Sequence, residues 1–185
     1  MTVKEYIKKL ETGDFDSKLT ELYGKTDLDR QKNRYKAAAE KFTEIFPQYV
    51  SSDISIFSAP GRTEIGGNHT DHQHGCVLAA AVNLDIIGVV HFHSEPVIRI
   101  KSEGYLMESV SLTDLSVREE ERETSAALIR GIAEGFRLTG FKIGGFDAYI
   151  TSEVPRGSGL SSSAAFEILI GTIINCGWNK GEVDA

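Results

Sequence analysis

"SEVPRGSGLSSSAAFEILIG", residues Ser152 to Gly171, joins a strand-like segment to a strongly apolar one through a loop of glycines and serines. The strand-like part ends at Pro155, and the loop contains Gly157, Gly159 and the run Ser161–Ser163. The first N–H groups of a helix lack intrahelical partners and meet the positive end of its dipole, so this junction favours an anion such as phosphate. One of the three serines could also hold Mg²⁺, as the hydroxyl of a P-loop does. Helix capping by serine is the competing interpretation.

A second polar cluster lies in "SAPGRTEIGGNHTDHQHG", Ser58 to Gly75, between two strand-like segments. Loops on a rigid sheet often carry binding groups, and this mixture of donors and acceptors suits a polyhydroxylated ligand. Asp71 could accept hydrogen bonds from two sugar hydroxyls, and Arg62 could stabilise an oxyanion or a phosphoryl oxygen. Zinc ligation by the histidines is an alternative, although their spacing matches no zinc motif, and a plain surface loop is another. The cluster also contains Glu64, Asn68, His69, His72 and His74.

Strand-like and helical segments alternate irregularly, which predicts an α+β protein. The short connections between the strand-like segments favour antiparallel pairing. In the longest amphipathic segment, Tyr35, Ala38, Phe42 and Ile45 share one helical face. The helix near the C-terminus is apolar on nearly all sides and is expected to be buried. Helices are predicted at 4–10, 27–46, 125–139 and 162–175, strands at 53–60, 76–82, 84–93, 97–102, 108–112 and 144–154, and a solvated charged stretch at 117–125. Of these strands, 144–154 is expected to be half-buried.

Composition narrows the class of protein. The chain has 185 residues, of which 41% are hydrophobic and 25% charged, as in ordinary globular domains. No apolar run reaches the roughly 18 residues that a membrane-spanning helix needs, so no membrane partner is expected. A net charge of −7 without a basic stripe argues against nucleic acid. Cys76 and Cys176 lie among apolar residues, which favours two buried, reduced thiols in the cytoplasm.

The two motifs together resemble those of the GHMP kinases, the superfamily that includes galactokinase, homoserine kinase, mevalonate kinase and phosphomevalonate kinase. "PRGSGLSSSAA" (155–165) resembles the second motif of the superfamily, and "APGRTEIGGNHTDHQHGCVLAAAV" (59–82) resembles the galactokinase signature. They occur in family order, and the resemblance covers about residues 50–175. It implies the N-terminal domain of a GHMP kinase, a ribosomal protein S5 domain 2-like fold with a mixed, mainly antiparallel sheet packed with helices.

The resemblance also implies an activity, which is transfer of the γ-phosphoryl group of ATP to the C1 hydroxyl of galactose with the aid of Mg²⁺. Ser163 matches a serine that holds Mg²⁺, and Arg62 matches a catalytic arginine at the reacting hydroxyl. The sugar contacts would come from Arg62, Asn68, His69 and Asp71. The phosphates of ATP would be wrapped by Pro155, Arg156, Gly157, Ser158, Gly159, Leu160, Ser161, Ser162 and Ser163. Galactose and ATP are therefore the expected partners, and the sequence does not indicate an oligomeric state.

Four positions depart from the family pattern. Glu64 replaces an asparagine, Gly66 a large aliphatic residue, Asn68 a glutamate and His72 a tyrosine. Asn68 can still hydrogen-bond a sugar hydroxyl but carries no charge, so the kinase class is better indicated than the sugar. Two alternatives stay open, namely a non-catalytic relative that binds sugar and ATP, and a GHMP kinase for another sugar.

The resemblance divides the chain into an N-terminal helical extension, residues 1–50, and an ATP- and sugar-binding domain, residues 51–185. In galactokinases the catalytic aspartate and a third glycine-rich motif follow the serine loop. The chain is therefore expected to be incomplete at its C-terminal end, without the C-terminal GHMP domain, and inactive by itself.

Overall fold

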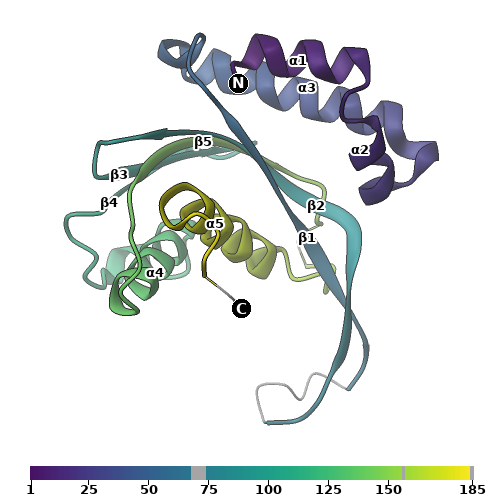
Figure 1. Cartoon of the computed structure of the whole chain (residues 1–185). Coiled ribbons are helices and arrows are strands. Elements are labelled where there is room, and N and C mark those ends of the chain that lie inside the picture. Colours follow the sequence, from purple (N-terminus) through teal and green to yellow (C-terminus); the bar gives the residue numbers. More distant parts are fainter. Residues whose placement is uncertain (68–73, 156, 184–185) are drawn as a thin grey trace.

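The computed structural model describes residues 1–67, 74–155 and 157–183, and in these residues one sheet lies between two layers of helices. Figure 1 shows the N-terminal helices on one face of the sheet and the later helices on the other. We call these the outer face and the inner face, respectively. The arrangement confirms the predicted α+β class with its mixed, mainly antiparallel sheet.

The outer layer consists of three helices joined by short turns. Its elements are α1 (Val3–Thr12), α2 (Asp16–Tyr23), η1 (Lys25–Asp27), α3 (Leu28–Ile45) and η2 (Pro47–Tyr49). A capping box starts α1, in which the Thr2 hydroxyl accepts from the Glu5 amide and the Glu5 carboxylate accepts from the Thr2 amide. The predicted apolar face of α3 is confirmed, since Tyr35, Ala38 and Phe42 are buried. The sequence does not predict α2.

The sheet has the strand order β1-β2-β5-β3-β4. All neighbouring pairs are antiparallel except β3 and β5, which run parallel. The strands are β1 (Ser55–Gly66), β2 (Leu78–His93), β3 (Val97–Ser102), β4 (Met107–Ser111) and β5 (Gly145–Ser152). The prediction of separate strands at 76–82 and 84–93 is wrong. Pairing with β1 absorbs the irregularity near Asn83 as a register shift, so one long strand, β2, results.

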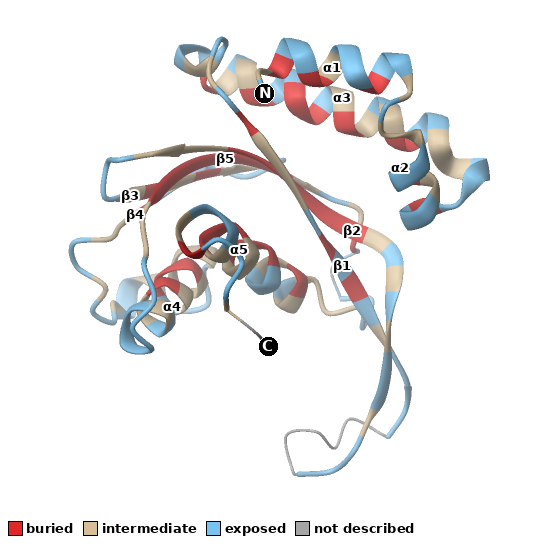
Figure 2. Ribbon diagram, in the orientation of Figure 1, coloured by how far each residue is buried: buried red, intermediate tan, exposed pale blue. Residues whose placement is uncertain are grey.

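The predicted half-burial of the strand at 144–154 is also wrong, because β5 is buried on both faces. The side chains expected to face solvent include Asp147 and Tyr149, which are 0% and 5% exposed. The N-terminal helices cover them, and Figure 2 shows the resulting buried band through β5 and β2. Two hydrophobic cores therefore flank the sheet, an inner one around Leu169 and Phe146 and an outer one around Phe42 and Ile87.

The inner layer holds η4 (Glu119–Glu121), α4 (Ser125–Leu138) and α5 (Ser162–Asn179). The predicted end of α4 is confirmed, since Gly140 follows the helix with a φ of 82°. The expectation that α5 is buried all round is wrong. A stripe that includes Leu169, Ile170 and Ile173 packs on the sheet, but Ile168 on the far side is 62% exposed.

Two further expectations need correction. Cys76 and Cys176 are exposed free thiols rather than buried ones, the second because it lies on the outward side of α5. The charged stretch at 117–125 is only partly solvated, because Glu121 pairs with the buried Arg130 of α4 at 2.6 Å. Among the described residues, no helix is long and apolar enough to cross a membrane.

Candidate functional site

The strand that carries the first motif touches the loop of the second. The Arg62 amide of β1 donates a hydrogen bond to the Leu160 carbonyl, with an N···O distance of 3.0 Å. Gly61 permits this approach. A Cβ atom there would lie 3.1 Å from the Leu160 oxygen, 3.2 Å from Val154 Cγ1 and 3.3 Å from the Leu84 oxygen. The fold therefore joins two sequence motifs that lie far apart in the chain.

The serine loop adopts a backbone suited to close approach by a ligand. Gly157, Gly159 and Ser161 have φ values of 69°, 77° and 57°, and such left-handed residues let successive amides point into one concavity. The Ser158 hydroxyl donates to the Pro155 carbonyl at 2.7 Å and accepts from the Leu160 amide at 3.4 Å. This serine therefore holds the loop together.

The loop leads into the N-terminus of α5. The first intrahelical bond runs from the Ala165 amide to the Ser161 carbonyl at 3.0 Å, so the amides of Ser162 and Ser163 come before this pattern. Such amides sit at the positive end of the helix dipole and can bind an anion.

A cavity of about 670 Å³ opens beside this helix N-terminus on the inner face of the sheet. Its volume falls within the roughly 300–1,000 Å³ of small-molecule pockets. Apolar side chains from β2, β5 and α5 line part of it, and hydroxyls and carboxylates line the rest. The lining includes Ile86, Ile150, Val154, Ser162, Ser163, Phe166, Glu103, Glu123, Thr124 and Ser125. The cavity thus combines an apolar wall with polar groups next to the serine loop.

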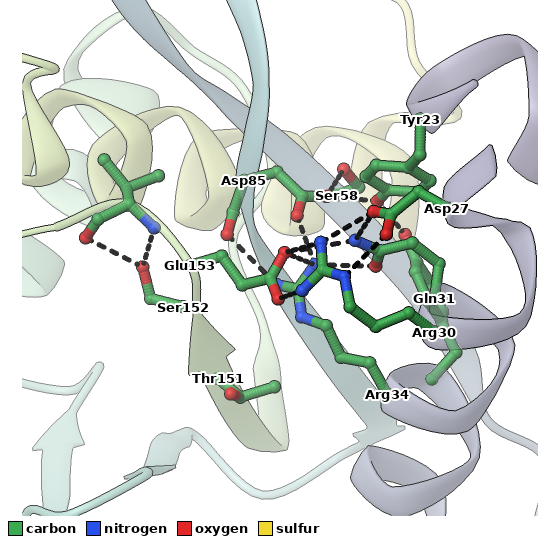
Figure 3. A network of polar contacts seen from close by, with 12 residues as sticks. Tyr23, Asp27, Arg30, Gln31, Arg34, Ser58, Asp85, Thr151, Ser152 and Glu153 are labelled. Carbon is green, nitrogen blue, oxygen red and sulfur yellow. Dashed lines mark hydrogen bonds and ion pairs between the residues drawn. The ribbon is translucent and has the colours of Figure 1, made fainter.

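A polar network on the outer face anchors the segments that lead into both motifs (Figure 3). The buried carboxylate of Asp85 accepts hydrogen bonds from Tyr23 Oη at 2.5 Å, from Arg34 Nη1 at 2.6 Å and from Ser58 Oγ. Glu153, directly after β5, pairs with Arg30 and accepts from Gln31 Nε2 at 3.1 Å.

The charges of this network follow from their partners. Burial acts to raise the pKa of Glu153, but hydrogen bonds from Arg30 and Gln31 outweigh it and hold that pKa below its ordinary value. Hydrogen bonds from the same two residues lower the pKa of Asp27 to about 2. Burial raises the pKa of the Tyr23 hydroxyl, so Tyr23 stays a protonated donor. At neutral pH the Glu153 and Asp27 carboxylates of the network are therefore ionised and the Tyr23 hydroxyl is neutral.

The predicted site residues fall into two groups. Arg62 is exposed on β1, and the described loop residues from Pro155 to Ser163 lie between β5 and the first turn of α5. Asn68, His69, Asp71 and Arg156 lie outside the described residues. In the described part of the chain, no group of three or more His, Cys, Asp or Glu side chains could hold a metal ion. The zinc alternative is not tested by this, because His69, Asp71 and His72 lie outside that part.

Sequence reasoning missed the cavity residues from the β3–β4 turn and the start of α4, and it missed the outer network. Glu103 and Thr124 carry no local signal, because only the tertiary fold brings them to the cavity. Asp85, in contrast, did carry a local signal in the sequence. It is a carboxylate inside the apolar run "LDIIGVV", where a buried charge requires partners.

Two family models match the chain. The galactokinase galactose-binding signature matches residues 40–92, and the N-terminal domain of GHMP kinases matches residues 127–184. A galactokinase from Clostridium tetani is 32% identical over 142 residues, which are 76% of this chain and 36% of the relative. A galactokinase from Streptococcus thermophilus is 35% identical over 137 residues, which are 73% of this chain and 34% of the relative.

Solved structures agree with these matches. The crystal structure of Lactococcus lactis galactokinase complexed with galactose has a TM-score of 0.69 at 27% identity, over 78% of this chain and 37% of that one. Mevalonate kinase from Methanococcus jannaschii has a TM-score of 0.58 at 17% identity, over 72% of this chain and 43% of that one, and supports the fold alone.

The fold and the paired motifs define a GHMP kinase N-terminal domain. Within that superfamily, the chain belongs to the galactokinase family. It spans about a third of the length of the curated relatives it matches.

Proposed function

We propose that the protein is an ATP-dependent sugar kinase that phosphorylates galactose at its C1 hydroxyl and yields galactose 1-phosphate and ADP in the cytoplasm. The observation that carries the proposal is the hydrogen bond between Arg62 and Leu160, beside the cavity. It brings the strand of the galactose-binding signature against the serine loop, as transfer between a sugar and a nucleotide requires. The galactose complex of the Lactococcus lactis relative supports the choice of sugar.

The residues around the cavity fit a nucleotide. The loop amides and the N-terminus of α5 would hold the phosphates, and the apolar wall formed by Ile86, Ile150 and Phe166 would take the base. The Ser163 hydroxyl, which lines the cavity, is the proposed protein ligand of Mg²⁺. Mg²⁺, when bound, would neutralise negative charge on the phosphates.

The sugar is proposed to bind beside β1. The Arg62 guanidinium would stabilise the charge on the transferring phosphoryl group, and Asn68, His69 and Asp71 would bind other sugar hydroxyls. In the reaction, the C1 oxygen forms a bond to the γ-phosphorus, the bond from that phosphorus to the bridging oxygen breaks, and the hydroxyl proton passes to a base. In the family that this chain resembles, the catalytic aspartate follows the serine loop, so we assign that base to no residue up to Ala185.

A sugar panel tests the proposal. The protein encoded by the complete native gene is supplied with Mg²⁺, ATP and either galactose, N-acetylgalactosamine, arabinose or glucose, and ADP release is followed. We expect ADP release with galactose. Residues 1–185 alone serve as the control, for which we expect no turnover. Turnover with another sugar only would instead support the kinase of a different sugar, and calorimetric binding of galactose and ATP without turnover would support the non-catalytic relative.

A further inference from the structure

Asp85 connects the two chain segments that lead into the motifs. It is 2% exposed on β2, where its carboxylate accepts from the Ser58 hydroxyl of β1. Its carbonyl oxygen accepts from the Glu153 amide at 2.9 Å. Ser58 begins the segment that reaches Arg62, and Glu153 begins the one that reaches Pro155. A single residue therefore holds the starting points of both motif segments.

Asp85 acts from the face of the sheet opposite to the cavity. Successive side chains of a strand point to opposite faces, and the next residue, Ile86, lines the cavity. The Asp85 side chain instead meets Tyr23 of α2 and Arg34 of α3. Any influence of Asp85 on a ligand in the cavity must therefore pass through the backbone.

The N-terminal helices hold this carboxylate rigidly. Arg34 forms an ion pair with it through Nη1 at 2.6 Å and binds its carbonyl through Nη2 at 3.0 Å. The Tyr23 hydroxyl, which donates to the carboxylate, also lies 2.7 Å from the Tyr35 hydroxyl. A buried carboxylate with this many partners has one strongly preferred position, because losing any partner leaves a buried charge or donor unpaired.

We propose that Asp85 is a positioning residue, which fixes the segments at Ser58 and Glu153 relative to one another and so keeps the sugar and phosphate loops in register. The proposal rests on the proposed function, which assigns those loops to galactose and ATP. Asp85 itself touches neither substrate.

Asp147 provides a matched control. It is a second buried carboxylate on the outer face, it is 0% exposed, and it too has an arginine and a tyrosine as partners. Arg99 Nη1 lies 3.1 Å and Tyr49 Oη 3.0 Å from its Oδ2 atom. Asp147 lies at the opposite end of β5 from Glu153, so its loss should weaken the fold without moving the motif segments.

The test compares Asp85→Asn with Asp147→Asn in the protein from the complete gene. We expect both variants to melt at a lower temperature. Asp85→Asn should raise the apparent KM values for galactose and for ATP at least about fivefold, and Asp147→Asn should leave both within about twofold. Equal effects of the two variants on KM would overturn the proposal. If Asp85→Asn does not fold, Ser58→Ala replaces it, because this change removes only the side-chain link from Asp85 to β1. Ser58→Ala should raise the KM for galactose and leave the KM for ATP unchanged. Unchanged KM values for both substrates would then overturn the proposal.

Hydrogen exchange separates this proposal from the proposed function. In the ligand-free protein, the Arg62 amide and the amides of residues 157–160 should exchange faster in Asp85→Asn than in Asp147→Asn. If that difference is found in a protein that phosphorylates no galactose, the positioning role stands and the proposed function fails. If these amides exchange at the same rate in both variants, the positioning role of Asp85 fails, whether or not the protein phosphorylates galactose.

Discussion

Gly61 lacks the side chain that would separate the two motif segments. We expect Gly61→Ala to destabilise the protein by about 1–3 kcal/mol, because the new Cβ atom would press on two backbone oxygens at a buried position of β1. Urea unfolding at neutral pH measures this. Gly131→Ala in α4 is the matched control. Among the described residues nothing lies within 4 Å of its new Cβ atom, so helix propensity should stabilise it by up to about 1 kcal/mol. Equal stability of Gly61→Ala and the wild type would contradict the close contact.

Ser163 is the proposed ligand of Mg²⁺, whereas the neighbouring Ser162 also lines the cavity but is assigned no metal. Ser163→Ala should weaken the Mg²⁺-dependent part of ATP binding by about tenfold, the loss expected for one charge-assisted contact. Calorimetric titration with ATP at several Mg²⁺ concentrations measures it, with Ser162→Ala as the control. A normal Mg²⁺ dependence in Ser163→Ala and a reduced one in Ser162→Ala would move the metal to Ser162.

The predicted helix start at residue 162 is confirmed, since α5 begins at Ser162, whereas the roles assigned to the serine-loop residues stay predictions. The glycines and serines of the second motif could be recognised because turn chemistry and helix starts leave local patterns. Asp85 could not be assigned a role, because its partners Tyr23 and Arg34 lie far away in the sequence and only the tertiary fold brings them next to it.

Among the secondary-structure elements, α3 and α4 were predictable, and β2 and β5 were predicted only in part. The apolar spacing of a helix can be recognised in the sequence. The register shift that lets two apolar runs form one strand, β2, depends on pairing with β1 and cannot be recognised in either run alone. β5 alternates like a half-buried strand, yet both of its faces are covered, because α3 packs on the outer one. Burial of a strand depends on layers that its own residues do not encode.

Glu153 links α3 to the end of β5, and the lowered pKa of its carboxylate makes that link sensitive to pH. A carboxylate whose pKa is lowered on folding stabilises the protein fully above its unfolded pKa, and this stabilisation is lost as the pH falls through the folded pKa. At pH 7, Glu153→Gln should therefore lower the free energy of unfolding by about 1–2 kcal/mol.

The difference between wild type and Glu153→Gln should shrink as the pH falls below 4.5, the ordinary pKa of the group. Urea unfolding from pH 7 to pH 3 measures it. Glu21→Gln, which breaks an exposed ion pair with Lys18, is the control and should change stability little at any pH. If the stability difference between Glu153→Gln and the wild type stays constant with pH, folding does not lower the pKa of the Glu153 carboxyl group.

The two faces of the sheet carry different structural features. The inner face carries the cavity with Ser162 and Ser163. The outer face carries the N-terminal helices (Figure 1) and the Asp85 network (Figure 3). The division of the chain at residue 50 stays a prediction. The outer core that residues 1–50 share with β2 and β5 indicates what these residues do for the fold.

Deletion of residues 1–53 should therefore unfold or aggregate the remainder, because Ile87, Val89 and Tyr149 on the outer face would meet water. Dye binding to exposed apolar surface and the cooperativity of thermal unfolding measure this. Thr2→Ala, which removes only the cap of α1, should cost about 1 kcal/mol and keep cooperative unfolding. A soluble deletion variant that unfolds cooperatively would make the extension dispensable.

Phosphorus NMR of a reaction mixture can follow the proposed phosphoryl transfer itself. The protein from the complete gene is incubated with Mg²⁺, ATP and galactose, and the fate of the γ-phosphoryl group is followed. The proposed reaction predicts loss of the γ-phosphate signal, appearance of ADP, and a new phosphomonoester signal coupled to the proton on C1 of galactose. A mixture in which ATP stays intact, or in which phosphate appears on another carbon or in free solution, would contradict it.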